Sequence, residues 1–227
     1  MKKALIAVCA FCMSTLASAQ DFYMPPLMGG DVAVGLAAQS HIQRSEENRA
    51  QADTAAVDLT FSSSAARTQQ NLQDFIARTP DPAAKADLQQ LVAAQPDIID
   101  LIGNAIRSYG LDPHNVADAY SVWWINSWLV SQMRGDDVGR ATVQAVRDQA
   151  RAALADIPGF SQTSDSERQA FAEALLLNAA ILDGAFEQSK NDPAALQQLA
   201  QAASRGAMNT GIDLSLMTLT QDGFVMR

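Results

Sequence analysis

The sequence predicts an all-α fold, a compact multi-helix bundle, because helix-start signals and apolar stripes both recur from about residue 64 onward. Asp-Pro pairs stand at 81–82, 112–113 and 192–193. Each pair suits a helix start, since the carboxylate accepts from free backbone N–H groups and proline at the first helical position loses no hydrogen bond. Ser164 and Glu167 have the spacing of a capping box. We therefore expect helices near residues 64–78, 82–94, 97–109, 113–133, 138–156, 165–190 and 193–207.

Apolar side chains share one face in several of these segments, so that each helix has a side to bury against its neighbours. Glycine tolerates the left-handed backbone that closes a helix, and we expect turns at Gly110, Gly135 and Gly159. The stripes are Leu72, Phe75, Ile76 and Thr79; Ile98, Ile99, Ile102, Ala105 and Ile106; and Phe171, Leu175, Ala179, Leu182 and Phe186.

Two short segments alternate in the manner of strands, residues 57–61 before the helices and residues 216–220 after them. They are placed to pair as a small two-stranded ribbon that joins the N- and C-terminal ends of the domain.

The first nineteen residues have the pattern of a signal peptide. Lys2 and Lys3 precede a mostly apolar run, and small residues end it at Ala17 and Ala19. We expect cleavage after Ala19 and a mature protein that is periplasmic or secreted. No later segment approaches the roughly 18 to 20 apolar residues of a spanning helix, so we expect no membrane span.

Residues 20–58 are rich in small, polar and charged residues and poor in large apolar ones. Such a segment buries too little apolar surface to offset the entropy of ordering it. We expect a flexible, low-complexity leader, with at most a helical turn near Glu46 to Ala52, followed by a single helical domain over residues 59–227.

Charge and cysteine content exclude several classes of function. The chain has a formal net charge of −9, and loss of Lys2 and Lys3 leaves 14 basic against 25 acidic residues. So acidic a chain repels phosphate backbones, and nucleic acid is a poor candidate partner. Cys9 and Cys12 both lie in the predicted signal peptide, which leaves the mature chain without a disulfide or a cysteine metal site. A lipoprotein anchor at Cys12 is the alternative, but the residues before it lack the usual leucine-plus-small-residue pattern.

All three tryptophans fall within Gly110 to Trp128, and two interpretations of this stretch stay open. Apolar residues go most of the way round the predicted helix, which is typical of a central helix enclosed on several sides. The alternative is a pocket in which Trp124 or Trp128 stacks on a ligand and Asp118 or Asn126 holds it by hydrogen bonds. These four residues are our candidate ligand-binding residues.

Chemistry-bearing motifs are few. With His41 in the predicted leader and His114 at a helix start, we expect no metal site, no cofactor and no assigned catalytic residue. One acid–base arrangement remains open, because Asp118 and Glu173 lie on long helices that are able to face each other. Asp118 in an apolar helix needs a partner, for which Arg107, Arg134 or a backbone N–H are candidates.

Three segments carry a resemblance to a known family: "YGLDPHNVADAYSVWWINSW", "EALLLNAAILDGAFEQSKNDP" and "DLSLMTLTQDGF". Over about Leu59 to Phe224 the chain resembles an uncharacterised family of exported proteobacterial helical proteins, a domain of unknown function. The most specific motif is Asn115 to Tyr120 with the tryptophans after it. The resemblance implies export and a compact helical domain, and it supplies no site.

Two classes of function therefore remain. The first is an exported non-catalytic helical module that binds a protein or an envelope component. The second is a hydrolase of envelope or extracellular polymers that uses a carboxylate pair.

Overall fold

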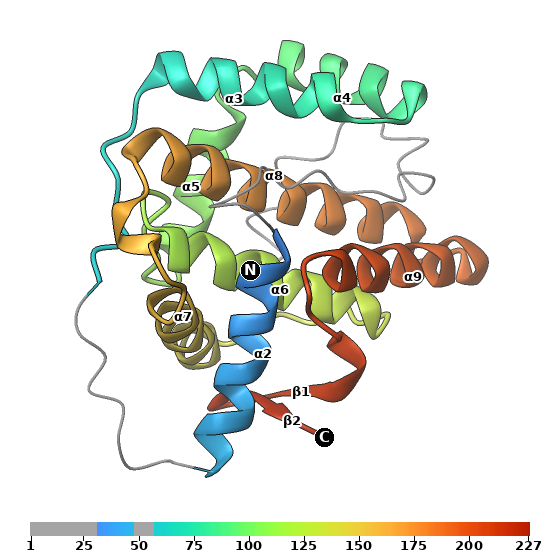
Figure 1. The fold of residues 1–227 in the computed structure, drawn as a ribbon. Coiled ribbons are helices and arrows are strands. Elements are labelled where there is room, and N and C mark those ends of the chain that lie inside the picture. Colours follow the sequence, from blue (N-terminus) through green and yellow to red (C-terminus); the bar gives the residue numbers. More distant parts are fainter. Residues whose placement is uncertain (1–30, 48–56) are drawn as a thin grey trace.

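The computed structural model describes residues 31–47 and 57–227 (Figure 1), with side chains 35–43 described in the first of these ranges. The predicted signal peptide, residues 1–19, lies outside the described residues. The elements are α2 (Asp31–Glu47), α3 (Ala65–Arg78), α4 (Pro82–Ala94), α5 (Ile98–Arg107), α6 (Val116–Ser131), α7 (Arg140–Ala155), α8 (Asp165–Ser189), α9 (Pro193–Asn209), β1 (Met217–Thr220) and β2 (Gly223–Met226), with short 3-10 helices at Phe160–Gln162 and Leu214–Leu216. The predicted all-α bundle is confirmed.

Helices α6 and α8 form the centre of the bundle and make its most extensive helix–helix contact. α8 lies between α6 on one side and α3 on the other, while α7 and α9 cover the remaining sides of α6 (Figure 1). Fifteen of the sixteen residues of α6 are buried, which explains why its apolar side chains point in every direction.

Among the described residues, α8 alone is long and apolar enough to cross a membrane by length and composition. This differs from the expectation that no later segment meets that test. Yet 94% of the most apolar window of α8 is buried inside the structure, because α3, α5, α6 and α9 pack around it. The buried core helix of a soluble protein passes the same test of length and composition, so this result is weak evidence for a membrane span.

Three of the four predicted helix starts are confirmed. Asp81 and Asp192 accept from the backbone of the first helical turn, and Ser164 with Glu167 forms a complete capping box. The prediction at Asp112 is wrong. Residues 112–115 form a turn, and Asn115 caps α6 by accepting from the backbone of Ala117 and Asp118 at 2.9 and 3.4 Å.

Two of the three predicted glycine turns adopt the left-handed backbone, with φ of 77° at Gly110 and 81° at Gly159. After α6, Met133 adopts it instead of Gly135, with φ of 52°.

The two-stranded ribbon exists, but its expected pairing is wrong. β1 pairs with β2 in an antiparallel hairpin, from Met217 opposite Met226 to Thr220 opposite Gly223. The other predicted strand forms only an isolated bridge between Thr60 and Asn115. That bridge fixes the start of the domain to the N-terminus of α6, with Val116 N donating to Leu59 O at 3.0 Å.

Residues 31–47 form helix α2 and differ from the flexible leader expected for residues 20–58. Ala38 and Ile42 are buried, and α2 packs against α7, α9 and β2. Gly35 allows this packing, since a side chain there would collide with the backbone of Thr210 and Gly211. The rest of the predicted leader up to residue 56 lies outside the described residues.

Candidate functional site

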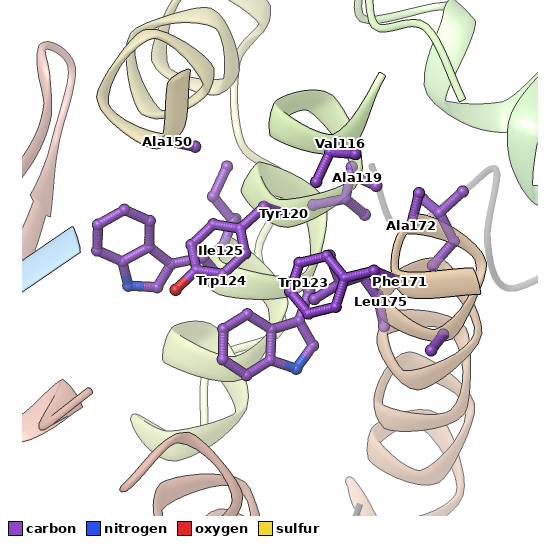
Figure 2. Packing of buried hydrophobic residues seen from close by; sticks show 14 of the residues in the cluster. Val116, Ala119, Tyr120, Trp123, Trp124, Ile125, Ala150, Phe171, Ala172 and Leu175 are labelled. Atoms are coloured by element: carbon purple, nitrogen blue, oxygen red, sulfur yellow. The ribbon is translucent and has the colours of Figure 1, made fainter. Parts of the chain in front are cut away.

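The tryptophans of α6 lie in the core. Trp123, Trp124 and Trp128 are 3%, 0% and 2% exposed. Trp124 stacks on Phe224 of β2 with ring centroids 4.6 Å apart, and Trp128 Nε1 donates to Met217 O at 3.1 Å. Figure 2 shows Trp123 on the side of α8, where Phe171 lies, and Trp124 on the opposite side. The aromatic side chains therefore hold the C-terminal hairpin and α8 onto α6.

Two polar atoms in this cluster lack a hydrogen-bond partner among the described residues, Tyr120 Oη and Trp124 Nε1. The two rings are 5.7 Å apart in an edge arrangement. Burial raises the pKa of the Tyr120 hydroxyl, which keeps it neutral.

Asp118 is buried at the start of α6, and its partner is the backbone. Asp112 N donates to Asp118 Oδ2 at 2.6 Å, whereas the side chain of Arg107 donates to Asn104 and that of Arg134 to Asp136. Burial raises the pKa of Asp118 to about 6, although the Asp112 hydrogen bond opposes the shift.

The four predicted ligand-binding residues are all buried in the bundle. Asn126 is 1% exposed and donates to Val122 O of its own helix at 2.9 Å. Within the described parts of the chain, none of the four lines either of the two cavities that the structure contains at α3.

A polar cluster that we call the α3–α8 seam joins these two helices. Glu173 of α8 is 5% exposed, and its carboxylate accepts three hydrogen bonds. Thr68 Oγ1 donates to Oε1 at 2.6 Å, Gln169 Nε2 donates to Oε1 at 2.9 Å, and Asn71 Nδ2 donates to Oε2 at 2.7 Å. A carboxylate offers about four acceptor positions, so the one that remains is available to another donor.

Gln169, one turn before Glu173, ties the start of α3 to the same seam. Its Oε1 accepts from Arg67 Nε at 2.7 Å and from Ser64 N at 3.1 Å, and its Nε2 donates to Ser64 O at 3.0 Å. This bonding fixes the rotamer of Gln169 and, through it, the donor that reaches Glu173.

The first cavity at the seam, which we call the polar cavity, has a volume of about 350 Å³. It lies between the start of α3, the start of α5 and the turn before α6. Three carboxylates line it, together with hydroxyl, amide and ring groups, and its described lining contains no lysine or arginine. The lining residues are Phe61, Ser63, Ser64, Ala65, Thr68, Gln69, Pro96, Asp97, Ile99, Asp100, Pro113, His114 and Glu173.

The second cavity, which we call the apolar groove, has a volume of about 240 Å³ and lies between α3 and α8. Its apolar lining is buried side chains of both helices, and its rim is charged. The lining residues are Asn71, Leu72, Asp74, Phe75, Arg78, Glu167, Ala170, Glu173, Ala174 and Leu177. Glu173 lines both cavities.

Asp118 and Glu173, the carboxylate pair expected for a hydrolase, have no neighbours in common among those described below. Asp118 bonds to the turn before α6 and feels the charges of Arg147 and Arg151 on α7, whereas all three partners of Glu173 come from α3 and α8. No cluster of three or more histidine, cysteine or acidic side chains able to hold a metal occurs in residues 31–47 and 57–227.

Sequence reasoning identified Glu173 and missed its partners. Gln169 and Glu173 are four residues apart on α8, and Glu173 interrupts the apolar run over residues 170–177. Thr68 and Asn71, three residues apart on α3, lie in the helical turn directly before Leu72, where the apolar stripe starts. Polar pairs at helical spacing on two buried faces are the signal that points to this seam.

Comparison with known proteins supplies a family. A search of curated proteins and a search of solved structures found no match. A family model described as a family of unknown function (DUF6683) matches residues 33–227, which include most of α2 and every element after it. Because this match covers most of the chain, the protein belongs to that family of unknown function.

Proposed function

We propose that this protein is an exported, non-catalytic helical module that binds a positively charged group of a partner protein or envelope component in the polar cavity. The observation that carries the proposal is the lining of that cavity. It brings Asp97, Asp100 and Glu173 together, and none of the described residues that line the cavity is a lysine or an arginine. A concave site with one sign of charge concentrates ligands of the opposite sign.

The carboxylates at the mouth of the polar cavity are available to a ligand. Asp97 and Asp100 are exposed, and Asp97 makes no capping hydrogen bond to α5 in the described structure. Asp97 is the N-cap residue of α5, and Asp100 lies in the first turn of this helix. The formal net charge of −9 adds a long-range attraction for cations.

Binding is favoured over catalysis by the state of the two buried carboxyl groups. The two oxygens of Glu173 are occupied by three hydrogen bonds from side chains of α3 and α8. Asp118, whose pKa of about 6 suits acid–base work, lines neither cavity of the described structure. Within the described residues, Asp118 and Glu173 therefore share neither of these two cavities, whereas a hydrolase that uses this pair would require a shared one.

Export rests on the first nineteen residues. Lys2, Lys3, the apolar run and the small residues at Ala17 and Ala19 support cleavage to a mature chain that begins at Gln20. Mass spectrometry of the envelope and culture fractions tests this. An intact Met1 or a lipid on Cys12 contradicts it.

The binding test uses a fluorescein-labelled lysine octamer and the mature chain. Anisotropy is expected to show saturable binding that weakens as salt rises, because screening reduces attraction between exposed charges. The double variant Asp97→Asn, Asp100→Asn is expected to weaken binding at least tenfold. A double variant on α7 and the hairpin turn, Asp148→Asn, Asp222→Asn, makes the same change in net charge and is expected to change binding less than twofold. Equal losses in both variants reduce the effect to net charge and contradict a site in the polar cavity.

A further inference from the structure

Glu173 forms the wall between the polar cavity and the apolar groove. Thr68, which bonds Oε1, lines only the polar cavity, and Asn71, which bonds Oε2, lines only the apolar groove. Each oxygen of one buried carboxylate is therefore held by the α3 residue of a different cavity. The two cavities are adjacent parts of one surface along α3.

The apolar groove suits one side chain. Its lining includes Leu72, Phe75 and Leu177, which are 5%, 5% and 2% exposed and together offer an aliphatic and aromatic floor. Its volume of about 240 Å³ lies below the roughly 300 to 1,000 Å³ of cavities that take whole small ligands. A leucine-sized side chain of a longer ligand matches the groove in size and polarity.

The distance along α3 sets the spacing of such a ligand. The α3 residues that line the polar cavity lie within 65–69 and those that line the groove lie within 71–78. The centres of the two sets are about seven residues apart, which at 1.5 Å per residue is on the order of 10 Å. In an extended peptide, side chains two residues apart project to the same face about 7 Å apart. This distance lies between the rise from Gln69 to Asn71, the nearest α3 residues of the two linings, and the distance between the centres of the linings. A basic and an apolar side chain two residues apart therefore reach one into each cavity.

We infer that the α3–α8 seam is a docking site for an extended, basic segment of a partner protein. A lysine or arginine enters the polar cavity, the apolar side chain two residues along enters the groove, and Glu173 lies between them as their common wall. Charge complementarity argues for this occupant, because the described linings of the two cavities together present Asp74, Glu167 and Glu173 beside the α5 carboxylates, with Arg78 as their one lysine or arginine. The inference rests on the proposed function and adds the class of ligand.

The test compares two labelled octapeptides on the mature chain. One has lysine and leucine alternating at every second position with serine between them. The other has serine in place of leucine and the same charge. The leucine peptide is expected to bind about tenfold more tightly, because one leucine side chain is removed from water in the groove. This comparison needs no variant of the protein.

A variant then assigns the gain to the groove. Ala170 is half-buried and lines the groove, so Ala170→Phe is expected to fill it and to reduce the leucine peptide to the affinity of the serine peptide. Binding of the serine peptide is expected to stay the same. Ala94→Phe, at the exposed end of α4, is the control and is expected to change neither affinity.

The outcomes separate the two proposals. Equal affinities for both peptides, with Asp97→Asn, Asp100→Asn still weakening both, overturn the docking inference and leave the cation site standing. A leucine advantage that survives Ala170→Phe overturns the assignment to the groove. No binding of either peptide overturns both proposals.

Discussion

The aromatic stretch of α6 and the α3–α8 seam differ in what their polar groups contact. In α6, Asp118 and Asn126 bond to nearby backbone atoms, and the tryptophans pack on Phe224, Met217 and α8. In the seam, Glu173 bonds to side chains of another helix and lines two cavities. The tryptophan-rich region is closed structure, and the candidate site lies at polar residues within a less conspicuous pair of helices.

This contrast shows that residue type alone does not distinguish a core from a site. Large aromatic side chains stabilise cores as readily as they stack on ligands. The two regions differ in whether the polar side chains beside the apolar ones face a cavity: Glu173 of the seam does, and Asp118 and Asn126 of α6 do not line either described cavity. Three substitutions test this contrast: the first removes Trp124 from the closed region, the second changes the buried carboxyl group of Asp118, and the third disturbs the packing of α2.

Replacement of Trp124 by alanine is expected to have the largest effect. Its side chain is fully buried and stacks on Phe224, so the loss of transfer free energy and the remaining cavity should lower the free energy of unfolding by about 3 to 5 kcal/mol. Urea unfolding measures it. Exposed Leu216→Ala is the control, with an expected change within about 0.5 kcal/mol. Parent-like unfolding of Trp124→Ala contradicts a closed core.

The carboxyl group of Asp118 should make the closed region more stable at low pH. Its folded-state pKa of about 6 exceeds the ordinary value of 3.8, so its ionisation is disfavoured in the folded protein. Its contribution to stability is therefore greatest below pH 3.8, falls between pH 3.8 and 6, and is constant above.

Asp118→Asn removes this titration and retains an oxygen that accepts from Asp112 N. At pH 7 the variant is expected to be more stable than the parent by about 1 to 3 kcal/mol, and the gain should disappear below the unfolded-state pKa. Urea unfolding of parent and variant from pH 3.5 to 7.5 measures it. A variant that is less stable at pH 7 contradicts this account of Asp118.

Gly35→Ala tests the cover that α2 provides over α7, α9 and β2. Alanine is a better helix former than glycine, but its methyl group would meet the Thr210 backbone, and relief of that overlap should cost about 1 to 3 kcal/mol. Gln43→Ala on the exposed face of α2 raises helix propensity without a clash and is the control. Thermal melting that ranks Gly35→Ala with or above the parent contradicts the docked position of α2.

The helices of the bundle could be predicted because their signals are local. Asp81, Ser164 and Asp192 cap the helices that their sequence pattern predicts, and most boundaries agree within three residues. Helix α2 was not predicted, because its few apolar residues give it a weak stripe. Its place depends on the close approach of Gly35 to Thr210, which is far away in sequence.

The hairpin and the seam show two different reasons for failure. Asp222 and Gly223 are a turn signal, with φ of 99° at Gly223, and the predicted pairing of residues 57–61 with 216–220 did not take it into account. The seam depends on Thr68 and Asn71 meeting Glu173 across about a hundred residues of chain. Glu173 was identifiable as the one carboxyl group in the apolar run over residues 170–177, but its neighbours follow only from tertiary structure.

Amide hydrogen exchange of the mature chain, with and without a saturating concentration of the lysine–leucine peptide, tests most directly whether binding takes place at the seam. The account predicts slower exchange in residues 61–78 and 96–100 on addition of the peptide, with exchange in α6 unchanged. Protection concentrated in α6 and the C-terminal hairpin, with α3 unchanged, would contradict it and return the candidate site to the tryptophans.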